Sequence, residues 1–185
     1  MKDIRLTRHN SLLLIVDVQQ RLVPAVRSSN AEELIPNIMT LIQAADLFGV
    51  PIVTTEQYPQ GLGPTVPELA ALLKGRAGLP KLSFSGVRDD GIRKDIEQHN
   101  RKQIILCGIE AHVCVLQTAL DLMLEGYGVH VISDAVGSRT ENNRLVGLSM
   151  IQAGGGILSS TETAAFQWAE QAGSDAFKAL SRLVR

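Results

Sequence analysis

Several features are scarce in this 185-residue chain, and each shortage excludes a class of protein. Its two cysteines, Cys107 and Cys114, are too few for a disulfide scaffold, so we expect a reducing, cytoplasmic setting. Aromatic residues make up 4% of the chain, which disfavours nucleic-acid binding by base stacking. The formal net charge of −1 gives no electrostatic reason to expect nucleic acid or an acidic membrane surface as a partner.

Long apolar runs and metal-binding patterns are missing as well. No apolar run approaches the roughly 20 residues of a membrane span, and the first residues lack the apolar centre of a signal peptide. The four histidines are scattered, and none has a metal-like partner at close spacing. Neither the GxxxxGK[ST] phosphate loop nor the GxSxG serine-hydrolase motif occurs. We therefore expect no membrane partner, and the chemistry must come from other residues.

What the chain does contain is a regular alternation of strand and helix patterns. Short apolar runs, of which the third is the weakest, predict strands at residues 12–18, 50–55, 79–84, 102–107, 128–133 and 157–158. Helical spacing and stop signals predict helices at residues 31–48, 68–74, 88–100, 112–125, 141–153, 162–171 and 175–183. This order predicts a single α/β domain over residues 1–185. The architecture would be a three-layer α/β/α sandwich with a mostly parallel sheet of about six strands.

The carboxyl ends of the predicted strands carry residues that can perform nucleophilic chemistry. Parallel α/β sheets bind ligands at that edge, where Asp17 ends the first strand and Lys81 lies in the weak third one. Cys114 falls in the first turn of a helix that follows a strand and Gly108, and helix starts stabilise a thiolate. Each residue alone also suits an ordinary role, as a cap, a solvated cation or an inert core thiol. Together they predict that Asp17 takes the thiol proton, Lys81 stabilises the thiolate and Cys114 attacks an electrophilic carbon.

Two neighbours of this predicted site are given other roles. Cys107 lies in the middle of a strand and is expected in the core. His112 is only two residues from Cys114, and residues two apart on a helix do not face each other. His112 is therefore a poor candidate for the base.

These residues resemble the isochorismatase-like cysteine hydrolases over about residues 11–163. The resemblance rests on LLLIVDVQ, PKLSFS and CGIEAHVCV, in which the family's catalytic Asp, Lys and Cys would be Asp17, Lys81 and Cys114. A further similar segment is SDAVGSR at residues 133–139. The resemblance implies an isochorismatase-like, Rossmann-like fold and a homo-oligomer, such as a dimer or tetramer. It also implies a cis peptide bond between Ile109 and Glu110, and an oxyanion hole made by the backbone N–H groups of Glu110 and Cys114.

The chain departs from parts of the family in two ways. Ala111 stands where many members have Thr. The nicotinamidases of the family bind a metal through one Asp and two His in the loop after the second strand, whereas this loop has no histidine and offers only Glu56 and Glu68. We therefore expect no catalytic metal and no cofactor. The segment EQYPQGLGPTVPEL most resembles the isochorismatase domain-containing proteins of animals and their bacterial relatives.

The hypothesis is a metal-independent cysteine hydrolase that cleaves a small amide or related C–N bond through a thioester-type intermediate. The alternatives are hydrolysis of an ester or ureide at the same triad, and a non-catalytic binding or scaffold protein that keeps the fold. The small-molecule substrate is predicted to contact Gln19, Tyr58, Leu62 and Phe84. The apolar C-terminal helices either form a subunit interface or dock on the same chain through Phe166, Trp168, Phe177 and Leu180.

Overall fold

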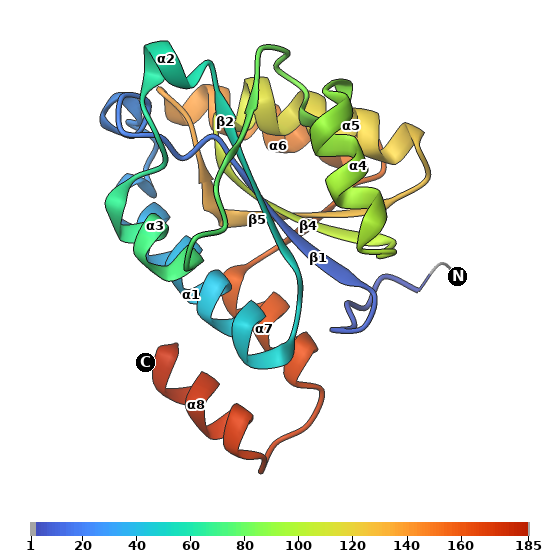
Figure 1. The fold of residues 1–185 in the computed structure, drawn as a ribbon. Coiled ribbons are helices and arrows are strands. Elements are labelled where there is room, and N and C mark those ends of the chain that lie inside the picture. Colours follow the sequence, from blue (N-terminus) through green and yellow to red (C-terminus); the bar gives the residue numbers. More distant parts are fainter. Residues whose placement is uncertain (1–2, 185) are drawn as a thin grey trace.

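A computed structural model describes residues 3–184, which form one six-stranded sheet in the order β3-β2-β1-β4-β5-β6 (Figure 1). The strands are β1 (Ser11–Val16), β2 (Ile52–Gln57), β3 (Leu79–Lys81), β4 (Gln103–Ile109), β5 (Gly128–Gly137) and β6 (Ile157–Ser159). Every neighbouring pair of strands is parallel. The predicted α/β fold with a parallel sheet is therefore confirmed.

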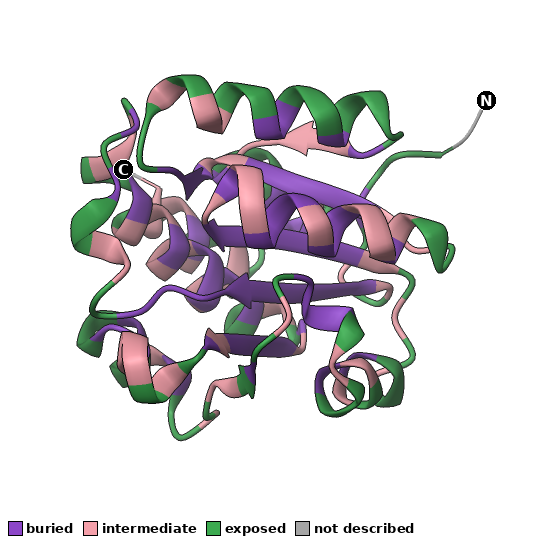
Figure 2. Cartoon of the chain, turned by 90° about the horizontal axis from the view of Figure 1, so that it is seen from above, coloured by how far each residue is buried: buried purple, intermediate pink, exposed green. Residues whose placement is uncertain are grey.

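Helices cover both faces of the sheet and make it the middle layer of three (Figure 1). One face is covered by α1 (Ala31–Phe48), α3 (Pro67–Leu73), α7 (Thr161–Ala169) and α8 (Asp175–Leu183). The other face is covered by α4 (Asp90–Gln98), α5 (Leu116–Leu124) and α6 (Glu141–Ala153). Figure 2 shows the buried strands between helices whose outer surfaces are exposed. None of the helices in the described part combines the length and apolar character needed to cross a membrane.

The alternation of side chains along β1 explains why this segment reads as a continuous apolar run. Leu13 and Ile15 pack in the core beneath α1, whereas Leu12, Leu14 and Val16 pack in the core beneath α4 and α5. Because both faces of a central parallel strand are covered, both sets of side chains must be apolar. All six residues of β1 are accordingly buried.

Some predicted boundaries differ from those in the structure. The third strand ends at Lys81 and does not continue to residue 84. The segment 56–67, expected to be a loop, contains the short helix α2 (Pro59–Leu62), and two further short turns, η1 (Val23–Ala25) and η2 (Gly86–Arg88), lie between or at the edge of the predicted elements. These turns lie in proline- and glycine-containing segments, where tertiary contacts decide the local conformation.

The C-terminal helices dock on their own chain. Trp168 and Leu180 are fully buried in the core beneath α1. The indole Nε1 of Trp168 donates to Ser11 Oγ at 3.0 Å, which ties α7 to the first strand. The rings of Phe166 and Phe177 meet edge to face with their centroids 5.9 Å apart, and this contact joins α7 to α8. Of the two alternatives expected for the C-terminal helices, docking on the same chain is therefore the one that describes these side chains.

The strand order reverses between β1 and β4, and this reversal determines where a ligand can enter. From β1 the chain moves outward through α1 to β2, whereas from β4 it moves the other way through α5 to β5. The connecting helices lie on opposite faces, so they leave a crevice beyond the carboxyl ends of β1 and β4. Asp17 follows β1 directly, and Cys114 follows β4.

Gly108 is required by the close pairing of these two central strands. It lies opposite Val16 and has a φ of +116°. A β-carbon at this position would lie 2.1 Å from the carbonyl oxygen of Val16. Because that oxygen belongs to a buried backbone, it cannot move away cheaply.

We expect Gly108→Ala to lower the free energy of unfolding by several kcal/mol. The matched control is Gly49→Ala, where φ is +68° but no atom lies within 4 Å of the new β-carbon. That control carries only the left-handed backbone penalty of about 1–2 kcal/mol. Urea unfolding measures both variants, and equal losses would contradict the steric argument.

Candidate active site

An ion pair between Asp17 and Lys81 lies at the carboxyl edge of the sheet. Lys81 Nζ lies 2.6 Å from Asp17 Oδ2, and neither side chain is exposed to solvent. Lys81 reaches this point because β3 joins the sheet, with Lys81 opposite Gln57 in the register of β2 and β3. The weak third strand thus brings two residues that are 64 positions apart into direct contact.

The backbone at Asp17 is unusual for a residue that follows a strand. Strand alternation would send its side chain to the α1 face together with Leu13 and Ile15. Its φ of +53° places it in the left-handed region, which few residues other than glycine adopt. The carboxylate instead meets the hydroxyl of Thr55, which donates to Asp17 Oδ1 at 2.7 Å. Strained backbone of this kind is concentrated at functional sites.

The Lys81 ammonium is surrounded by acceptors. Besides Asp17, it donates to Gln57 Oε1 at 2.6 Å, to the Phe84 carbonyl at 3.1 Å and to the Ser83 carbonyl at 3.3 Å. A buried lysine needs partners for its three N–H groups, because an unpaired buried charge is very costly. The segment that follows β3 supplies two of these acceptors by folding back over the lysine.

The sequence predicted Cys114 in the first turn of an α-helix, but the residue lies in a π-helical turn. The turn, η3, spans Ala111–Val115, and α5 begins at Leu116. The N–H group of Val115 donates to the Glu110 carbonyl five residues earlier, at 3.2 Å. Such wide turns are rare and frequently occur at functional sites. The turn places the Cys114 Sγ 4.0 Å from Gln57 Oε1 and leaves only 5% of the residue exposed.

The predicted lowering of the Cys114 pKa is wrong. Burial raises the pKa of the thiol to about 12, and the nearby negative charge of Asp17 raises it further than Lys81 lowers it. Lys81 cannot favour the thiolate strongly because its charge is already paired with Asp17. The resting state at neutral pH is consequently a protonated thiol. Burial likewise raises the pKa of Cys107, which lies in the core as predicted.

Glu110 holds the start of the cysteine turn. The peptide bond between Ile109 and Glu110 is cis, at the place where the family resemblance implied one. The Glu110 carboxylate accepts from the backbone N–H of Arg139 at 2.9 Å and from Arg139 Nε at 3.0 Å. This pair ties the end of β4 to the segment that follows β5. The proposed oxyanion donors, the N–H groups of Glu110 and Cys114, lie at the start of this turn and within it.

Gln19 does not present a free amide to a substrate. Its Oε1 accepts from the Gln57 N–H at 2.7 Å, and its Nε2 donates to the carbonyls of Gln57 at 2.9 Å and Gly63 at 2.6 Å. The side chain thus substitutes for a neighbouring strand beside Gln57 and also holds the following loop.

The other predicted substrate contacts lie around the lysine. Tyr58 and Phe84 are 51% and 53% exposed, so both rings are available at the surface. The Tyr58 N–H donates to the Lys81 carbonyl at 2.9 Å, and its ring lies against Gly61, where a β-carbon would be 2.1 Å from the ring. Leu62 is partly buried in the same loop. Tyr58 and Phe84 thus carry exposed rings on backbone segments that hydrogen-bond to Lys81.

Sequence reasoning missed Thr55 and Gln57. Both lie on β2, two residues apart, so they share one face of the sheet. The available signal was the polar TTEQ that ends an otherwise apolar strand at the carboxyl edge. His112 is not part of the group, since its Nδ1 pairs with Ser138 Oγ at 3.1 Å.

Of the two acidic residues expected in the loop after β2, Glu56 lies on β2 itself and has structural partners, whereas Glu68 is exposed in the first turn of α3. Glu56 Oε1 accepts from the N–H and the hydroxyl of Thr65, each at 2.7 Å. Across residues 3–184, no three His, Cys, Asp or Glu side chains gather closely enough to hold a metal ion.

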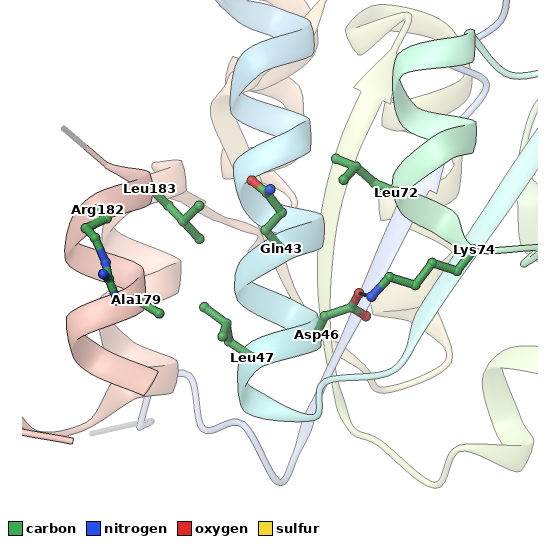
Figure 3. A pocket seen from close by; sticks show the side chains of 8 residues that line it. All are labelled: Gln43, Asp46, Leu47, Leu72, Lys74, Ala179, Arg182 and Leu183. Carbon is green, nitrogen blue, oxygen red and sulfur yellow. Dashed lines mark hydrogen bonds and ion pairs between the residues drawn. The ribbon is translucent and has the colours of Figure 1, made fainter. Parts of the chain in front are cut away.

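A separate hollow of about 510 Å³ lies far from this chemistry. Figure 3 shows its lining from the ends of α1, α3 and α8: Gln43, Asp46, Leu47, Leu72, Lys74, Ala179, Arg182 and Leu183. Helices α1 and α3 run back from the carboxyl edge, so their last residues lie at the opposite edge of the sheet. Its lining contains no cysteine, serine or threonine, and Lys74 is paired with Asp46.

Comparisons with known proteins identify the family. The Isochorismatase domain matches residues 11–163. The secreted isochorismatase effector Isc1 of Phytophthora sojae (strain P6497) is 40% identical over 98% of this chain and 87% of its own length. The isochorismatase domain-containing protein 2 of Danio rerio is 37% identical over 97% of this chain and 89% of its own length. The chain therefore belongs to the isochorismatase family of hydrolases.

Solved structures agree with this assignment. A Caenorhabditis elegans protein described as MAR1 ribonuclease superposes with a TM-score of 0.87 at 34% identity, covering 97% of this chain and 92% of that one. The YcaC gene product of Escherichia coli, described as an octameric hydrolase of unknown specificity, superposes with a TM-score of 0.88 at 26% identity. That match covers 92% of this chain and 85% of the other.

We expect Asp17→Asn to lower the pKa of the Cys114 thiol. The substitution removes the negative charge that opposes the thiolate, keeps an acceptor for Thr55 and leaves Lys81 as the nearest charge. Below the wild-type pKa the thiolate fraction then rises, so alkylation by iodoacetamide should be about tenfold faster or more. The measurement is the pH dependence of alkylation in a Cys107→Ala background.

The control for this measurement is Asp121→Asn. Asp121 is a carboxylate on α5 that pairs with Arg88 at the surface. The Asp121→Asn variant should leave the alkylation rate of Cys114 unchanged. A thiol pKa that stays the same or rises in Asp17→Asn would refute the electrostatic account.

Proposed function

We propose that the protein is a metal-independent cysteine hydrolase that cleaves a small amide or a related C–N bond. One observation carries the proposal. A buried carboxylate and a buried ammonium, 2.6 Å apart, meet a nearly buried thiol at the switch point of a parallel sheet. No structural need explains three such groups at the edge where these folds bind ligands.

The proposed reaction begins with transfer of the Cys114 proton to Asp17. Lys81 then stabilises the thiolate, because its former partner has become neutral. The sulfur attacks the substrate carbonyl carbon, and the backbone N–H groups of Glu110 and Cys114 stabilise the oxyanion. Asp17 returns the proton to the leaving nitrogen as the C–N bond breaks and a thioester remains.

The second half of the reaction uses the same groups. Asp17 removes a proton from water, which attacks the thioester carbon. The acid is released, and the sulfur recovers its proton from Asp17. Because the pKa of the resting thiol is raised to about 12, the first proton transfer must accompany substrate binding and attack.

Two alternatives at the same site remain distinct hypotheses. An ester or ureide offers the same kind of electrophilic carbon, and the triad accepts either. A binding or scaffold protein without activity is favoured by a different observation, namely that only 5% of Cys114 is exposed. The C. elegans relative is described as a ribonuclease, but a net charge of −1 gives this chain little attraction for RNA.

We also propose a cytoplasmic location and self-association. The two cysteines are both free and buried, which suits a reducing compartment, although the P. sojae relative is named as secreted. The outer face of α6 exposes Leu145, Val146 and Met150 by 52%, 46% and 49%. Exposed apolar clusters commonly mark interfaces, and the E. coli relative is described as octameric.

We expect a screen of small amides, ureides and esters to find a substrate whose turnover is abolished by Cys114→Ala. Loss should exceed about a thousandfold, since no other group replaces a covalent nucleophile. Cys107→Ala is the matched control, because that thiol lies in the core. Prolonged chelation should leave turnover unchanged. Activity retained in Cys114→Ala would move the chemistry elsewhere, and loss on chelation would overturn metal independence.

We expect light scattering to give a mass of at least a dimer. Leu145→Glu combined with Met150→Glu should shift the mass toward the monomer, because both changes place charge on the exposed face of α6. Leu47→Glu, at an exposed position of α1, is the control and should leave the mass unchanged. A monomeric wild-type protein at micromolar concentration would refute self-association.

A further inference from the structure

Gln57 occupies the centre of the polar group at the carboxyl edge, and the proposed reaction assigns it no step. It is the last residue of β2 and is only 9% exposed. Its Oε1 accepts from Lys81 Nζ at 2.6 Å and lies 4.0 Å from Cys114 Sγ. Among the described residues it is thus the neutral side chain that contacts both the ammonium and the thiol.

The orientation of the Gln57 amide is determined by its other contact. Its Nε2 donates to the Leu82 carbonyl at 2.9 Å. Lys81 has only donors, so an inverted amide would place N–H groups against N–H groups. The oxygen must therefore face Lys81 and the thiol, and the nitrogen must hold the segment that follows β3.

The backbone of Gln57 is also held in place. Gln19 accepts from its N–H at 2.7 Å and donates to its carbonyl at 2.9 Å. Four hydrogen bonds, formed with Gln19, Lys81 and Leu82, thus hold the Gln57 side chain and backbone in place. Such support is typical of a residue whose side chain must not change its orientation.

We propose that Gln57 is a positioning residue whose neutral side-chain oxygen accepts an N–H group of Lys81 beside Cys114 and gives it up when the thiol ionises. The proposal rests on the proposed function. In the resting protein Lys81 distributes its N–H groups among Asp17, Gln57 and the carbonyls of the next segment. When Asp17 takes the thiol proton, an N–H group of Lys81 turns from the Gln57 oxygen to the new thiolate. A neutral oxygen releases that hydrogen bond more easily than a carboxylate would.

Two variants of Gln57 test this role, because they differ mainly in charge. Gln57→Glu and Gln57→Met both lose the donor to the Leu82 carbonyl, so any loosening of that segment is common to both. Glu adds a second carboxylate that competes for Lys81 and repels the thiolate. Met removes the acceptor and frees the ammonium to face the thiolate.

We expect opposite effects on alkylation of Cys114 at a fixed pH in the Cys107→Ala background. Gln57→Glu should slow iodoacetamide by about tenfold or more, while Gln57→Met should react at least as fast as the parent. With a substrate in hand, Gln57→Glu should lose kcat with little change in KM. Gln152→Glu, an exposed position on α6, is the control for added charge and should not differ from the parent.

The results separate this inference from the proposed function. If both Gln57 variants change alkylation in the same direction, or neither changes it, the positioning role is overturned. If Gln57→Met is unfolded by circular dichroism, Gln57→Asn replaces it as the neutral variant and should change the rate in the direction of Met; an unfolded Gln57→Glu is replaced by Gln57→Asp, which should slow the reaction. A Cys114→Ala protein that keeps its activity would refute the proposed function while leaving the alkylation result intact.

Discussion

The buried ion pair between Lys81 and Asp17 is the constraint on which the carboxyl edge of this sheet depends. Removing two charges from water is costly, and their attraction compensates only when the remaining donors and acceptors are also satisfied. Here the pair sits at zero exposure and recruits Thr55, Gln57 and the carbonyl of Phe84. Strands β1, β2 and β3 each contribute to this network, so the register of three strands and the conformation of the following segment must agree.

The same pair explains the state of the cysteine. A lone lysine beside a thiol would favour the thiolate, but a lysine already neutralised by a carboxylate does so weakly. Burial then dominates, and the pKa of Cys114 rises to about 12. In the proposed reaction, protonation of Asp17 would release the positive charge of Lys81 as the thiolate forms. The pair would then couple removal of the proton to stabilisation of the sulfur.

Most of the fold could be predicted from the sequence because the central strands are covered on both faces and leave apolar runs. The site was less predictable, since its geometry depends on contacts between distant residues. No local pattern encodes the pairing of Lys81 with Gln57 across two strands. The wide turn at Cys114 likewise depends on α6, where Gly147 approaches so closely that a β-carbon would lie 2.6 Å from the Ala111 carbonyl. A sequence window around the cysteine contains no trace of that helix, so an ordinary α-helix was predicted.

Two glutamines connect the loop after β2 to the buried polar group around Lys81. Gln19 binds the backbone of Gln57 on one side and the Gly63 carbonyl on the other, so the loop after β2 is anchored through main-chain atoms. Side chains on that loop, such as the exposed Tyr58, carry none of this anchoring. Substitutions there can reshape the entrance while the distances around Lys81 stay the same. Under the proposed function, the side chains of this loop would contact the substrate while its backbone keeps the groups around Lys81 in place.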